Sequence, residues 1–181
     1  RFLYVSGIRI YKYQWSVIEA FFILRKKKYP VAIDFVGPIY DKKAGKLFQL
    51  YRNNYDPENR FTNHLAVLSY DKIYKIYRNY DAYIFASSQE NMPFTLLEPM
   101  ASGLPIACSD FELTREILGN NAIYFNPRDP EKIADAVTKL IEDKHIREKI
   151  AWKNFEKAKK YGWDRCVQKT MAFFKLVIQD E

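Results

Sequence analysis

Two glutamates, Glu90 and Glu98, have seven residues between them where an apolar run ends and a short helix is expected to begin. The helix opens at Phe94, so the backbone N–H groups of Phe94, Thr95 and Leu96 have no partner within it and form a site for an anion. Carboxylates on either side of that site can accept hydrogen bonds from sugar hydroxyls. A site in which amides bind phosphate and carboxylates bind sugar hydroxyls has the chemistry of a nucleotide-sugar pocket.

A purely structural role would explain the same residues. A negative side chain in the first turn of a helix is stabilised by the helix dipole, and glutamates are common on protein surfaces. The spacing of Glu90 and Glu98 alone does not decide between these two interpretations.

Short apolar runs alternate along the chain with longer stretches of helical periodicity. The runs predict six strands, at residues 2–6, 31–36, 64–68, 82–87, 105–109 and 122–125. Helical spacing predicts helices at 14–28, 41–53, 70–78, 94–102 and 145–160, one that begins at Asp129-Pro130, and a last one with Trp163, Val167, Met171, Phe174 and Ile178 on one stripe. This alternation predicts an α/β Rossmann-like, doubly wound fold: a six-stranded parallel sheet with helices on both faces and a helical C-terminal end.

Sheets of this kind bind ligands at the carboxyl ends of their strands, near the point where the strand order reverses. The loops of interest therefore follow Ser6, Gly37, Leu68, Ser87 and Ser109. Neither a G-x-G-x-x-G nor a Walker lysine motif occurs, so the sequence does not support an ordinary NAD or ATP site.

The composition is that of a folded, basic protein. Of the 181 residues 48% are hydrophobic, which excludes a disordered chain, and no apolar run approaches 18 residues. Cys108 and Cys166 are too far apart for a C-x-x-C site, and a reducing cytoplasm is expected. The two histidines, His64 and His145, have too few partners for a zinc site. The formal charge of +7 favours an anionic partner, which is a nucleotide, a phospholipid surface or a nucleic acid.

A nucleic-acid-binding module is the alternative from another class of protein. Tyr74, Tyr77 and Arg78 would be its candidate contacts, but their helical spacing fits an amphipathic helix better. The basic clusters at 25–28 and 157–160 fall at expected helix ends, where cations complement the dipole. We therefore expect no nucleic-acid partner.

The residues that follow the two glutamates strengthen the pocket interpretation. They read Met100-Ala101-Ser102-Gly103-Leu104-Pro105. With Glu90 and Glu98, this string resembles the signature of the retaining glycosyltransferases of family 4, also called group 1. Similar segments extend over nearly the whole chain, at 4–6, 18–21, 34–37, 118–119 and 129–130. The resemblance implies the C-terminal, donor-binding domain of a two-domain GT-B enzyme, with residues 1–181 forming one Rossmann-like domain and the N-terminal acceptor domain absent.

The resemblance also implies roles for individual residues. Glu90 matches the glutamate that binds donor-sugar hydroxyls, and Glu98 matches the one that binds the ribose. Lys12, seven residues before Glu19, matches the lysine that neutralises the diphosphate. The amides of Phe94, Thr95 and Leu96 would then lie near the diphosphate and the sugar.

The sequence departs from the family pattern at several positions. Gly7 stands where an arginine usually precedes Lys12, and Arg9 is a candidate replacement that needs a different loop path. Ala66 stands where a glycine usually lets the backbone approach the base. Its neighbours Leu65, Val67 and Leu68 fit a core position equally well. The segment 110–114 replaces a glycine-rich turn, although Glu116 still matches the glutamate after it.

The resemblance implies a hexosyltransferase that moves a sugar from a nucleotide-sugar donor, with retention, to a glycan or lipid-linked acceptor, in surface polysaccharide or lipopolysaccharide synthesis. No Asp-x-Asp pair occurs, so we expect neither a metal nor a cofactor. Because every recognised motif serves the donor, we expect this chain alone to be inactive. A cytoplasmic location, with peripheral contact at the inner membrane face, is compatible with the charge. A nucleotide-sugar epimerase or hydrolase on the same fold is the alternative, and the donor, base, acceptor and oligomeric state remain open.

Overall fold

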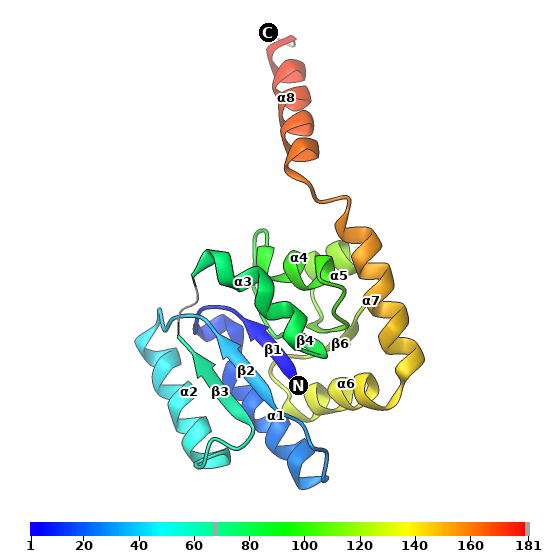
Figure 1. The fold of residues 1–181 in the computed structure, drawn as a ribbon. Coiled ribbons are helices and arrows are strands. Elements are labelled where there is room, and N and C mark those ends of the chain that lie inside the picture. The colour runs from blue at the N-terminus through cyan, green and yellow to red at the C-terminus, as the bar shows by residue number, and fades with distance from the viewer. Residues whose placement is uncertain (67–68, 180–181) are drawn as a thin grey trace.

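The computed structural model describes residues 1–66 and 69–179 and contains a parallel sheet flanked by helices (Figure 1). Its strands are β1 (Phe2–Val5), β2 (Ile33–Val36), β3 (Thr62–Leu65), β4 (Ala82–Phe85), β5 (Ile106–Ser109) and β6 (Ile123–Phe125). Their order in the sheet is β3-β2-β1-β4-β5-β6, and all neighbours run parallel. The predicted Rossmann-like, doubly wound fold is therefore confirmed.

Helices cover both faces of this sheet. On one face α1 (Gln14–Lys26), α2 (Lys42–Tyr55) and α6 (Pro130–Glu142) pack on the side chains of Phe2 and Tyr4. On the other face α3 (Tyr70–Ile76), α4 (Phe94–Ala101) and α5 (Glu112–Leu118) pack around Leu3 and Val5. Strands β1, β2, β4 and β5 are buried throughout, which explains why their residues are mostly apolar and do not alternate between apolar and polar; Asp34 in β2 and Ser109 in β5 are the polar residues among them.

The strand order reverses between β1 and β4. From β1 the chain moves outward through β2 to β3, and it then returns to begin β4 on the other side of β1. Loops that leave the carboxyl ends of β1 and β4 therefore border the crevice in which such sheets bind ligands.

The third strand begins and ends earlier than predicted. It spans Thr62–Leu65 instead of 64–68, and residues 67 and 68 lie outside the described part of the chain. The Asp56 carboxylate fixes the earlier start, because it accepts hydrogen bonds from the N–H groups of Phe61 at 3.1 Å and Thr62 at 2.7 Å. Of the two alternatives left open for Leu65, the structure excludes a core position: the residue ends an edge strand and is 39% exposed.

The segment 110–114, taken from the sequence only as a replaced turn, forms the start of α5. The Thr114 hydroxyl accepts a hydrogen bond from the N–H of Phe111 at 3.2 Å, and Arg115 forms an ion pair with Asp110. The first of these bonds pairs the N–H of the residue that caps the helix, and the second joins the helix to the residue before that cap, without the glycines that the family pattern places there.

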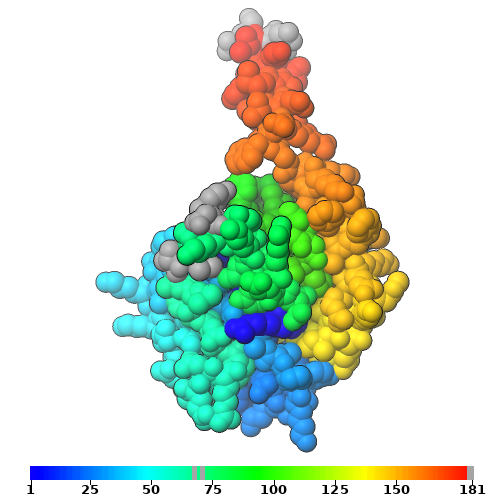
Figure 2. Space-filling model, viewed as in Figure 1, coloured from blue at the N-terminus to red at the C-terminus, as the bar shows by residue number. Residues whose placement is uncertain are grey.

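The last two helices are α7 (Lys144–Ala158) and α8 (Trp163–Gln179). α7 contacts both core clusters, through Ile150 and Ala158. α8 projects away from the rest of the protein, as both Figure 1 and Figure 2 show. Its side chains are exposed, including the stripe predicted from sequence. Within residues 1–66 and 69–179, no helix combines the length and apolar character that a membrane span requires.

Candidate functional site

Lys12 and Glu90 form an ion pair at the point where the strand order reverses. Lys12 ends the 3-10 helix η1 (Ile10–Lys12) after β1, and Glu90 lies in the loop after β4. The side chains are only 8% and 14% exposed, so the structure brings these two predicted residues together in a largely buried position. Two charges removed from water in this way depend strongly on each other.

The backbone around Lys12 is held on both sides. The buried hydroxyl of Tyr4 donates a hydrogen bond to the carbonyl oxygen of Lys12 at 2.7 Å. The next residue, Tyr13, has a φ of 48°, a left-handed conformation that is uncommon outside glycine. The Tyr13 hydroxyl also accepts a hydrogen bond from Arg128 at 3.1 Å. The ammonium of Lys12 lies 5.6 Å from the centre of the Phe85 ring, which adds a cation–π contact.

The loop that carries Glu90 is tied to the loop that carries Lys12. The N–H of Ser88 donates to the carbonyl oxygen of Tyr11 at 2.8 Å. The Ser87 hydroxyl donates to the carbonyl oxygen of Gln89 at 3.0 Å, which shapes the turn before Glu90. Direct bonds between the two loops therefore hold the ion pair in place.

The start of α4 offers fewer free amides than the sequence indicated. The N–H of Phe94 donates to Met92 at 3.1 Å and that of Leu96 donates to Pro93 at 2.9 Å, so the prediction of three free amides is wrong for both residues. The bond from Leu96 spans three residues rather than four, so this first turn is tighter than a regular α-helical turn. The N–H of Thr95 has no acceptor in the described part of the chain and keeps its capacity to bind an anion.

Glu98 is held by a residue that the sequence analysis did not select for this site. The hydroxyl of Tyr77, in the 3-10 helix η2 (Tyr77–Asn79), donates a hydrogen bond to Glu98 Oε2 at 2.5 Å. Tyr77 is 1% exposed, and burial raises the pKa of its hydroxyl well above the ordinary value. The sequence signal for this bond is a tyrosine shortly before the fourth strand, and its helical spacing favours an amphipathic helix over a site residue.

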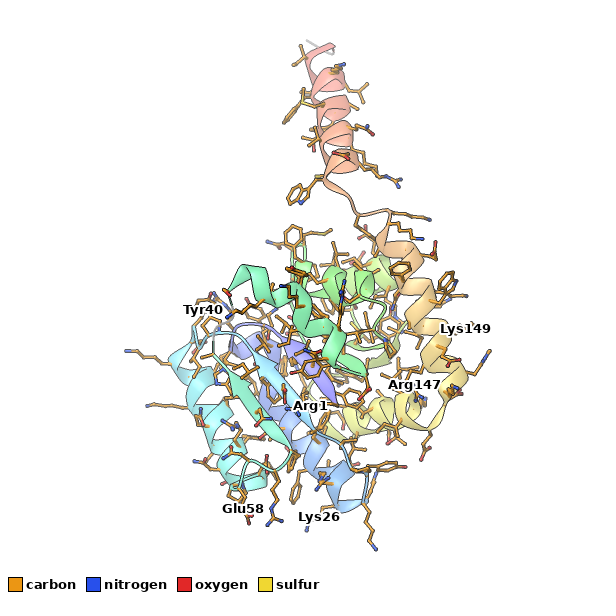
Figure 3. The ribbon with its side chains drawn as sticks, viewed as in Figure 1. Arg1, Lys26, Tyr40, Glu58, Arg147 and Lys149 are labelled. Carbon is orange, nitrogen blue, oxygen red and sulfur yellow. The ribbon has the colours of Figure 1, made fainter. Side chains whose placement is uncertain are left out.

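The space beside Gly7 is already occupied. A Cβ atom on Gly7 would lie 2.4 Å from the Tyr40 ring, and the Arg9 guanidinium stacks 4.6 Å from the centre of that ring. Figure 3 shows Tyr40 at the carboxyl end of β2. Gly7 does not adopt a positive φ, so an arginine at this position would meet a side chain rather than backbone strain. Gln14 fixes the loop by donating to the Gly7 carbonyl oxygen at 3.1 Å.

A cavity of about 580 Å³ lies next to Glu98. Phe94 and Glu98 of α4 line one side, and Trp163 and Cys166 of α8 line the other. The rings of Phe94 and Trp163 stack with their centres 6.0 Å apart. The first turn of α8 thus borders the same helix that carries the expected ribose ligand.

Two further expectations concern the base-binding position Ala66 and a metal ion. Ala66 follows β3 and is exposed, but the residues after it lie outside the described ranges, so its role remains a prediction. In residues 1–66 and 69–179, no three His, Cys, Asp or Glu side chains form a group that could hold a metal ion.

A parallel sheet with this strand order defines a Rossmann-like domain, and the Lys12–Glu90 pair lies at its switch point, where sheets of this kind bind ligands. The sequence model of one family, described as glycosyl transferases group 1, matches residues 1–157. The chain therefore belongs to the group 1 glycosyltransferases.

Similar proteins include an enzyme of glycan assembly. O-antigen chain mannosyltransferase B of Escherichia coli is 25% identical over 95 residues, which are 52% of this chain and 25% of that protein. Anabaena HepE, solved with UDP and glucose, has a TM-score of 0.83 at 18% identity and covers 96% of this chain. The C-terminal domain of LpcC, a group 1 protein of Francisella tularensis, has a TM-score of 0.75 at 22% identity, with 88% of this chain and 84% of that one covered. These two structural likenesses show the fold.

The chain spans only part of its longer relatives. It covers a quarter of the Escherichia coli mannosyltransferase and 47% of the HepE chain.

Proposed function

We propose that this chain is the donor-binding half of a retaining glycosyltransferase of family 4. It binds a nucleotide sugar in the crevice between the β1 and β4 loops, and the complete enzyme transfers the sugar to a glycan or lipid-linked acceptor. The name of the Escherichia coli relative supports an acceptor of the surface-polysaccharide type.

The observation that carries the proposal is the Lys12–Glu90 ion pair beside the start of α4. A donor that enters this site presents a negative diphosphate to Lys12 and sugar hydroxyls to Glu90. The donor can therefore satisfy both charges that now satisfy each other. The free amide of Thr95 lies on the helix that begins four residues after Glu90 and offers a second contact for phosphate.

The same groups would assist departure of the nucleoside diphosphate. Negative charge builds on the leaving phosphate as the sugar bond breaks, and a fixed ammonium with an aligned amide stabilises that charge without reorganising. We propose on this basis that Lys12, rather than a metal ion, balances the leaving group. Donor binding that does not change on addition of a chelator is the expected result.

We propose that α8 contacts the acceptor domain of the same enzyme. Phe174 is 51% exposed and Ile178 is 71% exposed on a helix that projects from the protein (Figure 1). The chain also covers only a quarter of the length of the Escherichia coli relative. In the full-length enzyme, Phe174→Asp with Ile178→Asp should lower transfer while donor binding persists. Lys175→Asp on the same helix is the matched control.

The proposal is tested by comparing binding with turnover. Nucleotide sugars that bind the folded chain raise its thermal stability, by about 2.7 kcal/mol at a hundredfold excess over Kd. We expect UDP- or GDP-sugars to stabilise the 181-residue chain without transfer, and the full-length enzyme to transfer the same sugar. If no nucleotide sugar stabilises the chain, the donor site is wrong. If the full-length enzyme only hydrolyses or epimerises the donor, the reaction is wrong.

A further inference from the structure

The two glutamates of the site have partners of different charge. Glu90 is paired with an ammonium, whereas Glu98 accepts its hydrogen bond from a neutral phenol. The contact with Tyr77 therefore brings no positive charge to Glu98. Its partner, Tyr77, comes from a segment 21 residues earlier in the chain.

The Tyr77 hydroxyl is an obligatory donor. The ring is buried against Tyr83, with the ring centres 6.0 Å apart, and burial raises the pKa of the hydroxyl well above its ordinary value. The hydroxyl thus remains protonated at neutral pH. Because it is buried, loss of Glu98 as an acceptor would leave it unsatisfied.

This bond restricts the Glu98 carboxylate. A glutamate side chain has several rotatable bonds, and on a short helix such as α4 it samples many positions unless something holds it. Tyr77 holds Oε2 from the buried side, and Glu98 is part-exposed and lines the cavity beside α4. Within residues 1–66 and 69–179, no hydrogen bond reaches the other oxygen, Oε1, which can therefore accept from a ligand.

We propose that Tyr77 is a positioning residue that fixes the Glu98 carboxylate so that it can accept hydrogen bonds from the ribose hydroxyls of the donor. The inference rests on the proposed function, because it needs a nucleoside diphosphate in this site. It explains why the site would bind a nucleotide with a ribose more tightly than a nucleotide whose sugar lacks the 2′ and 3′ hydroxyls.

The test measures how strongly the chain distinguishes UDP from 2′,3′-dideoxy-UDP, which lacks both hydroxyls. Tyr77→Phe removes the phenol oxygen and leaves the ring in the core. We expect it to weaken UDP binding roughly three- to tenfold, as for loss of one hydrogen bond, and to leave dideoxy-UDP binding unchanged. If UDP binds too weakly for titration, GDP and 2′,3′-dideoxy-GDP serve as the probes.

Tyr83→Phe is the matched control. It also removes a buried hydroxyl, one that donates to the Val5 carbonyl oxygen at 3.1 Å and, in the described part of the chain, forms no hydrogen bond with Glu98. We expect it to lower thermal stability and to leave the ratio of the two affinities unchanged. In a Glu98→Ala background, Tyr77→Phe should have no further effect on that ratio.

Two results overturn the inference. In the first, Tyr77→Phe leaves the ratio of the UDP affinity to the dideoxy-UDP affinity unchanged, while Glu98→Ala lowers that ratio. In the second, Tyr77→Phe weakens the binding of both nucleotides equally, as a purely structural role predicts. If Tyr77→Phe does not fold, Glu98→Gln is the second variant: it leaves one carbonyl oxygen for two donors, the Tyr77 hydroxyl and the ribose, so the UDP preference should fall. An unchanged preference there also overturns the inference. If Glu98→Ala itself has no effect on either nucleotide, the donor assignment fails instead.

Discussion

The Lys12 ammonium and the Glu90 carboxylate form a largely buried ion pair that joins the loop after β1 to the loop after β4. The two residues are 78 positions apart in the chain, and they meet because β1 and β4 are neighbours in the sheet. Under the proposed function, this one contact holds both the cation for the diphosphate and the acceptor for the sugar.

The first prediction concerns stability. Removing one member of a buried ion pair leaves the other without a partner, which costs about 3–5 kcal/mol. Lys12→Met and Glu90→Gln should each lower the free energy of unfolding in urea. The double variant should lose less than the sum of the two single losses. Losses that simply add would show that the two charges do not depend on each other.

The second prediction concerns competition for Lys12. Under the proposed function, a diphosphate that binds the Lys12 ammonium must displace the Glu90 carboxylate from it. Glu90→Gln should therefore bind bare UDP or GDP as tightly as the original chain or more tightly. The same variant should distinguish less well between donor sugars, because the carboxylate that accepts their hydroxyls is gone. Competition titrations with several sugar nucleotides measure both effects. Weaker binding of the bare diphosphate would contradict the competition.

The third prediction follows from the Tyr40 ring beside Gly7. An arginine at position 7 must displace the Tyr40 ring, and Arg9 then loses this ring as its stacking partner. Tyr40 is 63% exposed, so the ring can move into solvent. Gly7→Arg combined with Tyr40→Ala should tighten diphosphate binding by about 1 kcal/mol, the scale of a part-exposed charge contact, and Gly7→Arg alone should do less.

Salt dependence and Arg9→Ala provide the check on this third prediction. A new phosphate contact weakens as salt rises. If Arg9→Ala alone abolishes diphosphate binding, Arg9 already supplies the missing cation and the combined variant should bring no gain.

The fourth prediction concerns alkaline pH. Burial raises the pKa values of Tyr4, Tyr77 and Tyr83 above the ordinary value of 10.0. Above that pH the unfolded chain releases these protons while the folded chain retains them, so stability is complete below pH 10 and falls as pH rises further. Each phenol contributes a slope of about −1.4 kcal/mol per pH unit. Urea unfolding between pH 9 and 11 should show the fall, and Tyr83→Phe should reduce the slope. Stability that does not change over this interval would contradict the assignment.

The sequence predicted those parts of the protein that depend on local pattern. Buried parallel strands appear in the sequence as mostly apolar runs. The spacing of Glu90 and Glu98 and the family resemblance at Lys12 identified the charged residues of the candidate site. The start of β3 was missed because it is fixed by Asp56, a residue in a polar loop, through hydrogen bonds to the strand.

The remaining features depend on contacts between distant segments. The bond from Tyr77 to Glu98 joins η2 to α4, and the Tyr40 ring reaches Gly7 from the loop after β2. The amide count at α4 failed for a different reason, because Phe94 and Leu96 bond to carbonyl groups immediately before the helix. Residue type and helix position do not determine such a tightened first turn.

The central claim is that the diphosphate of a nucleotide sugar binds at Lys12. The most direct measurement is calorimetric titration of UDP and uridine, or GDP and guanosine, into the original chain, Lys12→Met and Lys149→Met. Lys149 is an exposed lysine on α7, away from the site, and serves as the control (Figure 3). We expect the diphosphate to bind more tightly than the nucleoside in the original chain and in Lys149→Met, and this advantage to disappear in Lys12→Met. An advantage that survives Lys12→Met, or none in the original chain, would contradict the account.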